Sequence, residues 1–89
     1  MNKISYYYIM SFPTTTDAMQ AEKYMKEHFH ITIMPTPREI SSGCGLAIRF
    51  MEPHENAILD FVQTAPLNGT LYKMYTHKVN GLHPIEKLL

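Results

Sequence analysis

The chain contains a single cysteine among its 89 residues, and it contains no tryptophan. One cysteine cannot close an internal disulfide, and the lack of a second one excludes a CxxC pair and a cysteine-rich structural zinc site. A free thiol is typical of a reducing compartment, so we expect a cytoplasmic location. The apolar stretch near the N-terminus is too short for a signal peptide with its cleavage site.

The chain also lacks an excess of charge of either sign, because eight Lys and Arg residues balance eight Asp and Glu residues. Strong nucleic-acid binders usually carry a basic patch, and attraction to an anionic membrane needs a polybasic run. No apolar run approaches the roughly 20 residues that span a bilayer. We therefore expect neither a nucleic acid nor a membrane as partner, while the balanced charge leaves self-association open.

Metal-ligand spacing is missing as well. The five histidines are dispersed along the chain, and neither an HxxxH nor an HExxH pattern occurs. A metal site would have to bring the lone cysteine together with distant histidines. We predict neither a metal nor another cofactor.

What the chain does contain is a series of strand-like and helix-like segments. Aromatic and β-branched residues at 4–12 predict a first strand, and shorter segments at 31–34, 46–51 and 70–76 predict three more. Apolar residues at helical spacing predict one helix over residues 16–28 and a second that starts at Pro53 and ends before Pro66. The length fits one domain, which we place at residues 1–79, followed by a C-terminal tail at residues 80–89.

The order of these segments is β-α-β-β-α-β, which is typical of an α+β fold of the ferredoxin-like, split βαβ kind. This fold predicts a four-stranded antiparallel sheet with two helices on one face. The other face would carry tyrosines and methionines. It is expected to lie open or to contact a second subunit in a homodimer.

The cysteine stands in a turn-like segment, residues 37–50, which reads PREISSGCGLAIRF. A thiolate is the reactive form of cysteine. Amide N–H groups in a glycine-rich turn and nearby cations can lower a thiol pKa from about 8.5 toward neutrality. Cys44 is therefore the candidate reactive residue. The residues expected to stabilise its thiolate are Arg38, Ser41, Ser42, Gly43, Gly45 and Arg49.

Two interpretations of Cys44 stay open from the residues alone. It is either a nucleophilic or carrier thiol, or a small apolar side chain at the start of a strand. The second interpretation leaves a small, dimeric interaction module of unknown function with a structural cysteine. A cysteine-dependent enzyme is less well supported, because no histidine can be paired with Cys44 from the sequence.

The Pro-Arg…Ser-Ser-x-Cys-Gly core of this segment resembles a bacterial domain family of unknown function, called putative selenium/sulfur carrier protein-like. The aromatic opening strand, Phe12 and the pair Thr14 and Thr15 resemble that family too, and the likeness spans about residues 5–75. It implies that Cys44 holds sulfur or selenium as a persulfide or selenopersulfide, in a carrier rather than an enzyme. Donor and acceptor proteins would be the partners, since no second cysteine is present to release the atom.

Overall fold

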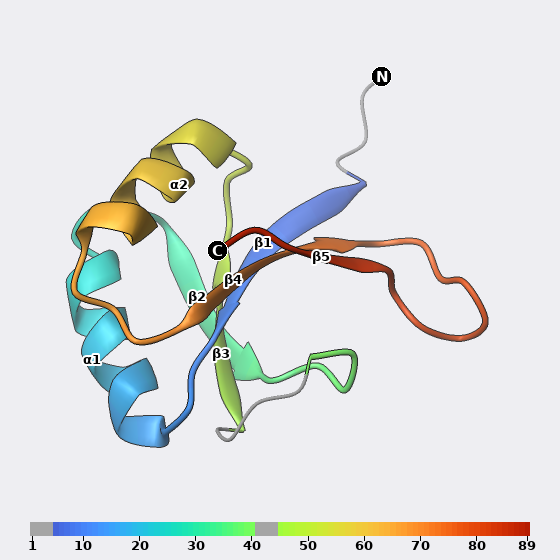
Figure 1. Cartoon of the computed structure of the whole chain (residues 1–89), viewed down its shortest axis with the longest axis horizontal. Coiled ribbons are helices and arrows are strands. Elements are labelled where there is room, and N and C mark those ends of the chain that lie inside the picture. Colours follow the sequence, from blue (N-terminus) through green and yellow to red (C-terminus); the bar gives the residue numbers. More distant parts are fainter. Residues whose placement is uncertain (1–4, 41–44) are drawn as a thin grey trace.

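The structure, a computed structural model, describes residues 5–40 and 45–89. Within these residues seven helices and strands follow one another, and Figure 1 colours them in chain order. They are β1 (Tyr6–Ser11), α1 (Thr15–Met25), β2 (Ile31–Pro35), β3 (Leu46–Phe50), α2 (Glu55–Thr64), β4 (Thr70–Tyr75) and β5 (Ile85–Lys87).

The strands form a five-stranded antiparallel sheet in the order β2-β3-β1-β4-β5. The predicted α+β fold, with two helices and an antiparallel sheet, is confirmed, but the sheet has five strands where the sequence predicted four. The extra strand comes from the C-terminal residues. The chain turns back after β4 and pairs Ile85 with Met74 and Lys87 with Tyr72.

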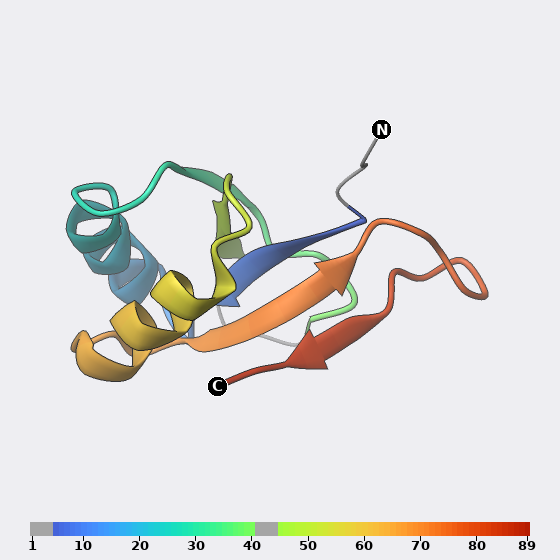
Figure 2. The same cartoon turned by 90° about the horizontal axis from the view of Figure 1, so that it is seen from above.

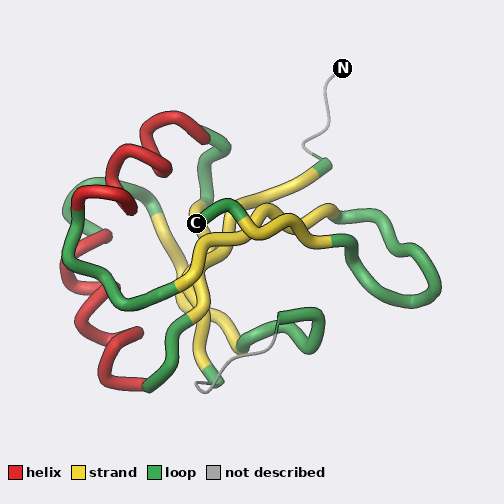
Figure 3. The backbone as a smooth tube through the Cα atoms, viewed as in Figure 1, coloured by secondary structure: helices red, strands yellow, loops and turns green. Residues whose placement is uncertain are grey.

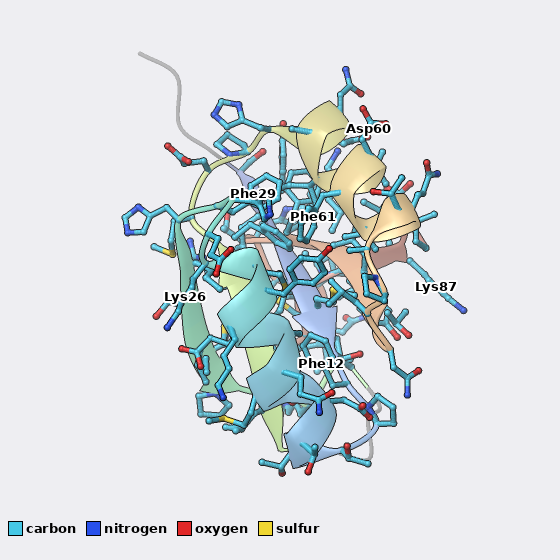
Figure 4. The ribbon with its side chains drawn as sticks, turned by 90° about the vertical axis from the view of Figure 1, so that its left-hand side faces the viewer. Phe12, Lys26, Phe29, Asp60, Phe61 and Lys87 are labelled. Atoms are coloured by element: carbon cyan, nitrogen blue, oxygen red, sulfur yellow. The ribbon has the colours of Figure 1, made fainter. Side chains whose placement is uncertain are left out.

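Both helices cover the same face of the sheet, and Figure 2 shows them together on one side of the strands. Side chains from both helices and four strands meet in this layer. The rings of Phe29 and Phe61 lie 5.2 Å apart between centroids, and Figure 4 shows both between the two helices. The fully buried members of this cluster are Tyr8, Met10, Phe12, Ala18, Ala21, Met25, Ile48, Phe50, Ile58 and Leu71.

Helix α1 begins at Thr15, one residue before the predicted start, and ends at Met25, three residues before the predicted end. The Thr14 side chain accepts a hydrogen bond from the Asp17 amide at 3.1 Å, which satisfies one of the free N–H groups of the first turn. Helix α2 begins at Glu55 rather than at Pro53, so that prediction is wrong by two residues. His54 occupies the cap position of α2 without a side-chain cap bond.

The opposite face of the sheet carries a second, smaller cluster. Its buried members are Ile9, Ile40, Ala47 and Met74. Ile40 belongs to no strand: it comes from the connection between β2 and β3 and folds onto the sheet. This face is therefore partly covered by the chain itself.

The connection between β4 and β5, which we call the C-terminal hairpin (residues 76–84), extends away from the sheet (Figure 3). Val79 and Leu82 pair in an isolated bridge, and Asn80 and Gly81 between them have φ of 53° and 82°. Positive φ at both central residues is the geometry of a two-residue type I′ turn, which the Asn-Gly sequence favours.

Candidate functional site

The segment with the lone cysteine is the connection between β2 and β3, which we call the cysteine loop (residues 36–45). Pro35 and Leu46 are register partners, and the Thr36 N–H donates to the Gly45 carbonyl at 2.9 Å. The loop is therefore closed at its base by the end of the sheet. Its residues 41–44, which include Ser41, Ser42, Gly43 and Cys44, lie outside the described residues.

The first part of the cysteine loop forms a turn, which we call the motif turn (residues 37–40). The Ile40 N–H donates to the Pro37 carbonyl at 3.0 Å. Ile40 is only 4% exposed, because its side chain packs in the cluster with Ile9, Ala47 and Met74. The buried isoleucine fixes the turn against the sheet, in the way that any well-packed apolar side chain restricts its backbone.

Arg38 and Glu39 extend from the motif turn to the C-terminal hairpin. Arg38 Nη2 donates to the Gly81 carbonyl at 3.3 Å, and Glu39 Oε2 accepts from the His83 N–H at 2.9 Å. The hydrogen bond from the His83 amide is the main cause that lowers the pKa of Glu39, and a bond from its own amide adds to it. The structure thus joins the predicted site residue Arg38 to a segment more than 40 residues away.

Arg49 lies along β3, away from the base of the cysteine loop. It is four residues beyond Gly45 along β3, a distance of about 13 Å at the usual rise per residue. Its guanidinium carbon sits 4.1 Å from the centre of the Tyr7 ring, and its Nε is buried without a hydrogen-bond partner in the described chain. Burial raises the pKa of Tyr7, and the Arg49 cation partly opposes that shift. A role for Arg49 at the thiol stays a prediction.

Position 45 does not require glycine for steric reasons, as far as the described atoms are concerned. A Cβ added there would meet nothing within 4 Å, and its φ lies outside the left-handed region. Its described contribution is the carbonyl that closes the loop. Gly81, in contrast, does adopt a left-handed φ of 82°.

Glu39 was not among the residues predicted to stabilise the thiolate. Its partner His83 follows it by 44 positions, and no local pattern links the two. Within residues 5–40 and 45–89, no three His, Cys, Asp or Glu side chains gather closely enough to hold a metal ion. Neither helix of the described chain is long and apolar enough to cross a membrane.

The fold defines the protein as a small α+β domain, and its lone cysteine falls in the sequence between β2 and β3. Residues 7–73 match the family described as "Putative Se/S carrier protein-like". The chain belongs to this family. The match contains the whole cysteine loop and ends within β4, before the C-terminal hairpin.

An uncharacterized protein from the archaeon Methanocaldococcus jannaschii is 40% identical over 42 residues. These residues are 47% of this chain and 21% of that protein, so the chain spans about a fifth of the length of this curated relative. An archaeal relative lends no support to the expected bacterial origin. No solved structure matches the chain.

Proposed function

We propose that the protein carries one sulfur or selenium atom on Cys44 and passes it to a partner protein. The single observation that carries this proposal is the family match over residues 7–73, which includes the cysteine loop. Cys44 is also the sole cysteine, so it is the one thiol of this chain that can hold the atom. We place the carrier in the cytoplasm, where a lone thiol stays reduced.

Loading and release are both thiol exchange reactions. The Cys44 thiolate attacks the terminal sulfur of a donor persulfide. The new bond forms between Cys44 and that sulfur, the donor S–S bond breaks, and the donor leaves as a thiolate. An acceptor thiolate then attacks the carried sulfur, and Cys44 leaves as a thiolate. A selenopersulfide donor would deliver selenium in the same way. Neither step needs an added oxidant.

Several features of the described residues support this chemistry. The cysteine loop is closed at its base by the bond between Thr36 and Gly45, and Arg38 is an exposed cation of the motif turn. A nearby cation favours a thiolate over a thiol. Arg38, the loop amides and the hydroxyls of Ser41 and Ser42 are the groups proposed to stabilise the anion on Cys44.

The fold proposed for this carrier is the ferredoxin-like arrangement, with β5 as an added edge strand. The sheet order β2-β3-β1-β4 of the first four strands supports it, as does the alternation with α1 and α2. In this arrangement the cysteine loop is the hairpin connection between an edge strand and its neighbour. Such connections reach solvent, where a partner protein can approach them.

The test is to incubate the protein with a cysteine desulfurase and cysteine, and to weigh the intact chain. We expect the mass of wild type to increase by one sulfur atom, and the mass of Cys44→Ser to stay unchanged. Added thiol should remove the gained sulfur. If wild type gains neither sulfur from cysteine nor selenium from selenocysteine in its place, or if Cys44→Ser gains equally, the carrier proposal is wrong.

The alternative is an interaction module in which Cys44 is structural. One observation favours it: Val79 is 54% exposed and Leu82 is 44% exposed on the C-terminal hairpin, so the hairpin offers an apolar tip to a partner or a second copy. The rate of Cys44 alkylation as a function of pH separates the two functions. A slow thiol with a pKa above about 8.5 favours the module.

A further inference from the structure

Strand β2 forms one edge of the sheet and carries little that would keep another strand from pairing with it. The sheet order places β2 and β5 at the two edges, and Figure 4 shows β2 at the margin of the molecule next to α1. Strand β5 has three residues, and its Glu86 and Lys87 are charged and exposed. Strand β2 has five residues, and no Asp, Glu, Lys or Arg occurs between positions 29 and 37. Of two common protections of an edge, charge and proline, β2 has proline alone, at its last residue.

The outer side of β2 presents a short row of backbone groups that β3 does not use. The His30 carbonyl and the Thr36 N–H each form a 2.9 Å hydrogen bond with a residue that flanks β3. Since alternate residues of an antiparallel strand face the same neighbour, the N–H and C=O groups of Ile31 and Ile33 point away from β3. Pro35 also faces outward, but it has no N–H. Among the described residues, no strand lies beyond β2 to pair with this row.

The sequence along this row is symmetric, which suits it to pairing with a second copy of the same chain. Ile31-Thr32-Ile33 reads the same in both directions. Antiparallel pairing about a two-fold axis at Thr32 places Ile31 of each copy opposite Ile33 of the other. Residues that face each other in this way exchange both of their backbone hydrogen bonds. Every N–H and C=O group of Ile31 and Ile33 is then paired.

The neighbouring registers leave groups of this row unpaired. A register with Ile33 on the axis places the Ile31 carbonyl opposite Pro35, which has no N–H to donate. A register with Ile31 on the axis places Ile33 opposite Phe29, whose N–H already donates to the Met25 carbonyl at 2.9 Å. Because an unpaired backbone group in an interface costs free energy, the register with Thr32 on the axis is favoured.

The side chains of β2 fit the same arrangement on both faces of the sheet. Ile31 and Ile33 pack against the cluster under the helices, so Thr32 between them points to the other face, where it is exposed. Two threonines that lie directly opposite each other form a favourable cross-strand pair. On the helix side, the isoleucines of the two copies would continue one apolar layer from one subunit to the next.

Helix α1 adds an exposed apolar side chain beside this edge. Asn68 Nδ2, just before β4, donates to Asp17 Oδ2 at 3.4 Å, so the Asp17 side of α1 is turned toward β4. Met19 follows by two residues, which is roughly half a turn around the helix, and so lies on the opposite flank, toward β2. Its side chain is 44% exposed. A second copy that pairs along β2 would reduce this exposure.

We propose that β2 is the interface of a symmetric homodimer, in which two copies of this chain pair antiparallel along β2 with Thr32 on the two-fold axis. The two sheets then form one continuous sheet with β5 at both ends. A two-fold contact uses the same patch on both copies, and the symmetric sequence of this edge supplies such a patch. The balanced charge of the chain adds no net repulsion between the copies. The proposal does not depend on sulfur transfer.

Sedimentation velocity over a range of concentrations measures the association. The contact consists of one strand pair and the adjoining helix flanks, so we expect a weak dimer with a Kd of about 10–100 µM. Thr32→Lys places two like charges opposite each other on the axis and should raise the Kd about tenfold or more. Gln63→Lys adds the same charge to an exposed position of α2 and should leave the Kd unchanged.

A mixing experiment separates repulsion at the axis from damage to the fold, since Thr32 is the register partner of Arg49 within the chain. Thr32→Glu should also weaken association by itself. An equimolar mixture of Thr32→Lys and Thr32→Glu should associate again, because opposite charges then meet on the axis. A mixture that stays as monomeric as Thr32→Lys alone would contradict the register.

Disulfide trapping tests the position of the axis directly. Residues that face each other at a non-hydrogen-bonded position have Cα atoms about 4.5 Å apart, a separation that a disulfide can bridge. In the Cys44→Ser background, Thr32→Cys should form a covalent dimer under mild oxidation at least about tenfold faster than Glu86→Cys, which is exposed on the other edge. Equal rates would overturn the proposal. So would a wild-type protein that stays monomeric at every concentration, or a dimer that Thr32→Lys leaves unchanged.

Discussion

Glu55 connects three elements on the helix-covered face of the sheet, and its removal is the most informative stability test. It lies in the first turn of α2, accepts a hydrogen bond from the Tyr8 hydroxyl of β1, and lies 3.8 Å from Lys73 Nζ of β4. Tyr8 is 1% exposed, so its hydroxyl has little access to water. Burial raises the pKa of Tyr8, and the bond to Glu55 raises it further, so the phenol stays a donor in any neutral assay.

The expected cost of Glu55→Ala is dominated by the lost hydrogen bond from the Tyr8 hydroxyl. A hydrogen bond to a charged group contributes about 1.5–3 kcal/mol. A carboxylate in the first helical turn adds about 0.3–1 kcal/mol. The ion pair with Lys73 adds at most about 0.5 kcal/mol, because Glu55 is 43% exposed at its side chain. We expect Glu55→Ala to lower the free energy of unfolding by about 3 kcal/mol, a large share of the total for a domain of this size.

Urea unfolding followed by circular dichroism measures this value, and a double-mutant cycle isolates the bond. Tyr8→Phe removes the hydroxyl alone. In the Tyr8→Phe background, Glu55→Ala should lower the free energy of unfolding by only about 1 kcal/mol. That loss comes from the carboxylate at the helix end and from the ion pair with Lys73. Glu52→Ala, an exposed glutamate just before α2, is the control and should change stability by less than about 0.5 kcal/mol. An unchanged cost of Glu55→Ala in the Tyr8→Phe background would refute the reasoning.

Two further predictions follow from close contacts and charge. Gly69→Ala should destabilise the fold by about 1–3 kcal/mol, since its Cβ would lie 2.7 Å from the Ser11 backbone oxygen. Gly45→Ala, whose Cβ meets nothing, should stay within about 0.5 kcal/mol, and equal losses in urea unfolding would contradict this contrast. The pKa of Glu39 is lowered, so its carboxylate should keep the bond from the His83 N–H at every pH above the ordinary carboxyl pKa. The bond should be lost only as the pH falls through the lowered pKa. An NMR titration of the His83 amide with a midpoint at or above pH 4.5 would contradict this prediction.

The sequence predicts most of the elements because their signals are local. Apolar residues at helical spacing place α1, and Thr14 is its observed cap. The strands from 31, 46 and 70 begin where β-branched and apolar residues begin. The start of α2 is misplaced because proline at position 53 fits a helix start, yet the cap geometry falls on His54.

The fifth strand was missed because its signal is not local. Residues 85–87 include one apolar side chain, Ile85, and their strand conformation depends on pairing with β4. The Asn80-Gly81 pair was the available signal, since it favours a two-residue hairpin and a returning strand. The contact between the motif turn and the C-terminal hairpin was missed for the same reason: Glu39 and His83 are brought together only by the completed sheet.

The contacts of the motif turn have a consequence for the order in which the molecule matures. Arg38 and Glu39 find their partners 43 and 44 positions downstream. On the ribosome, the turn emerges well before the residues that secure it, because chains are made from the N-terminus onward. The motif turn of a nascent polypeptide thus gains these two contacts only after residues 81 and 83 have been translated.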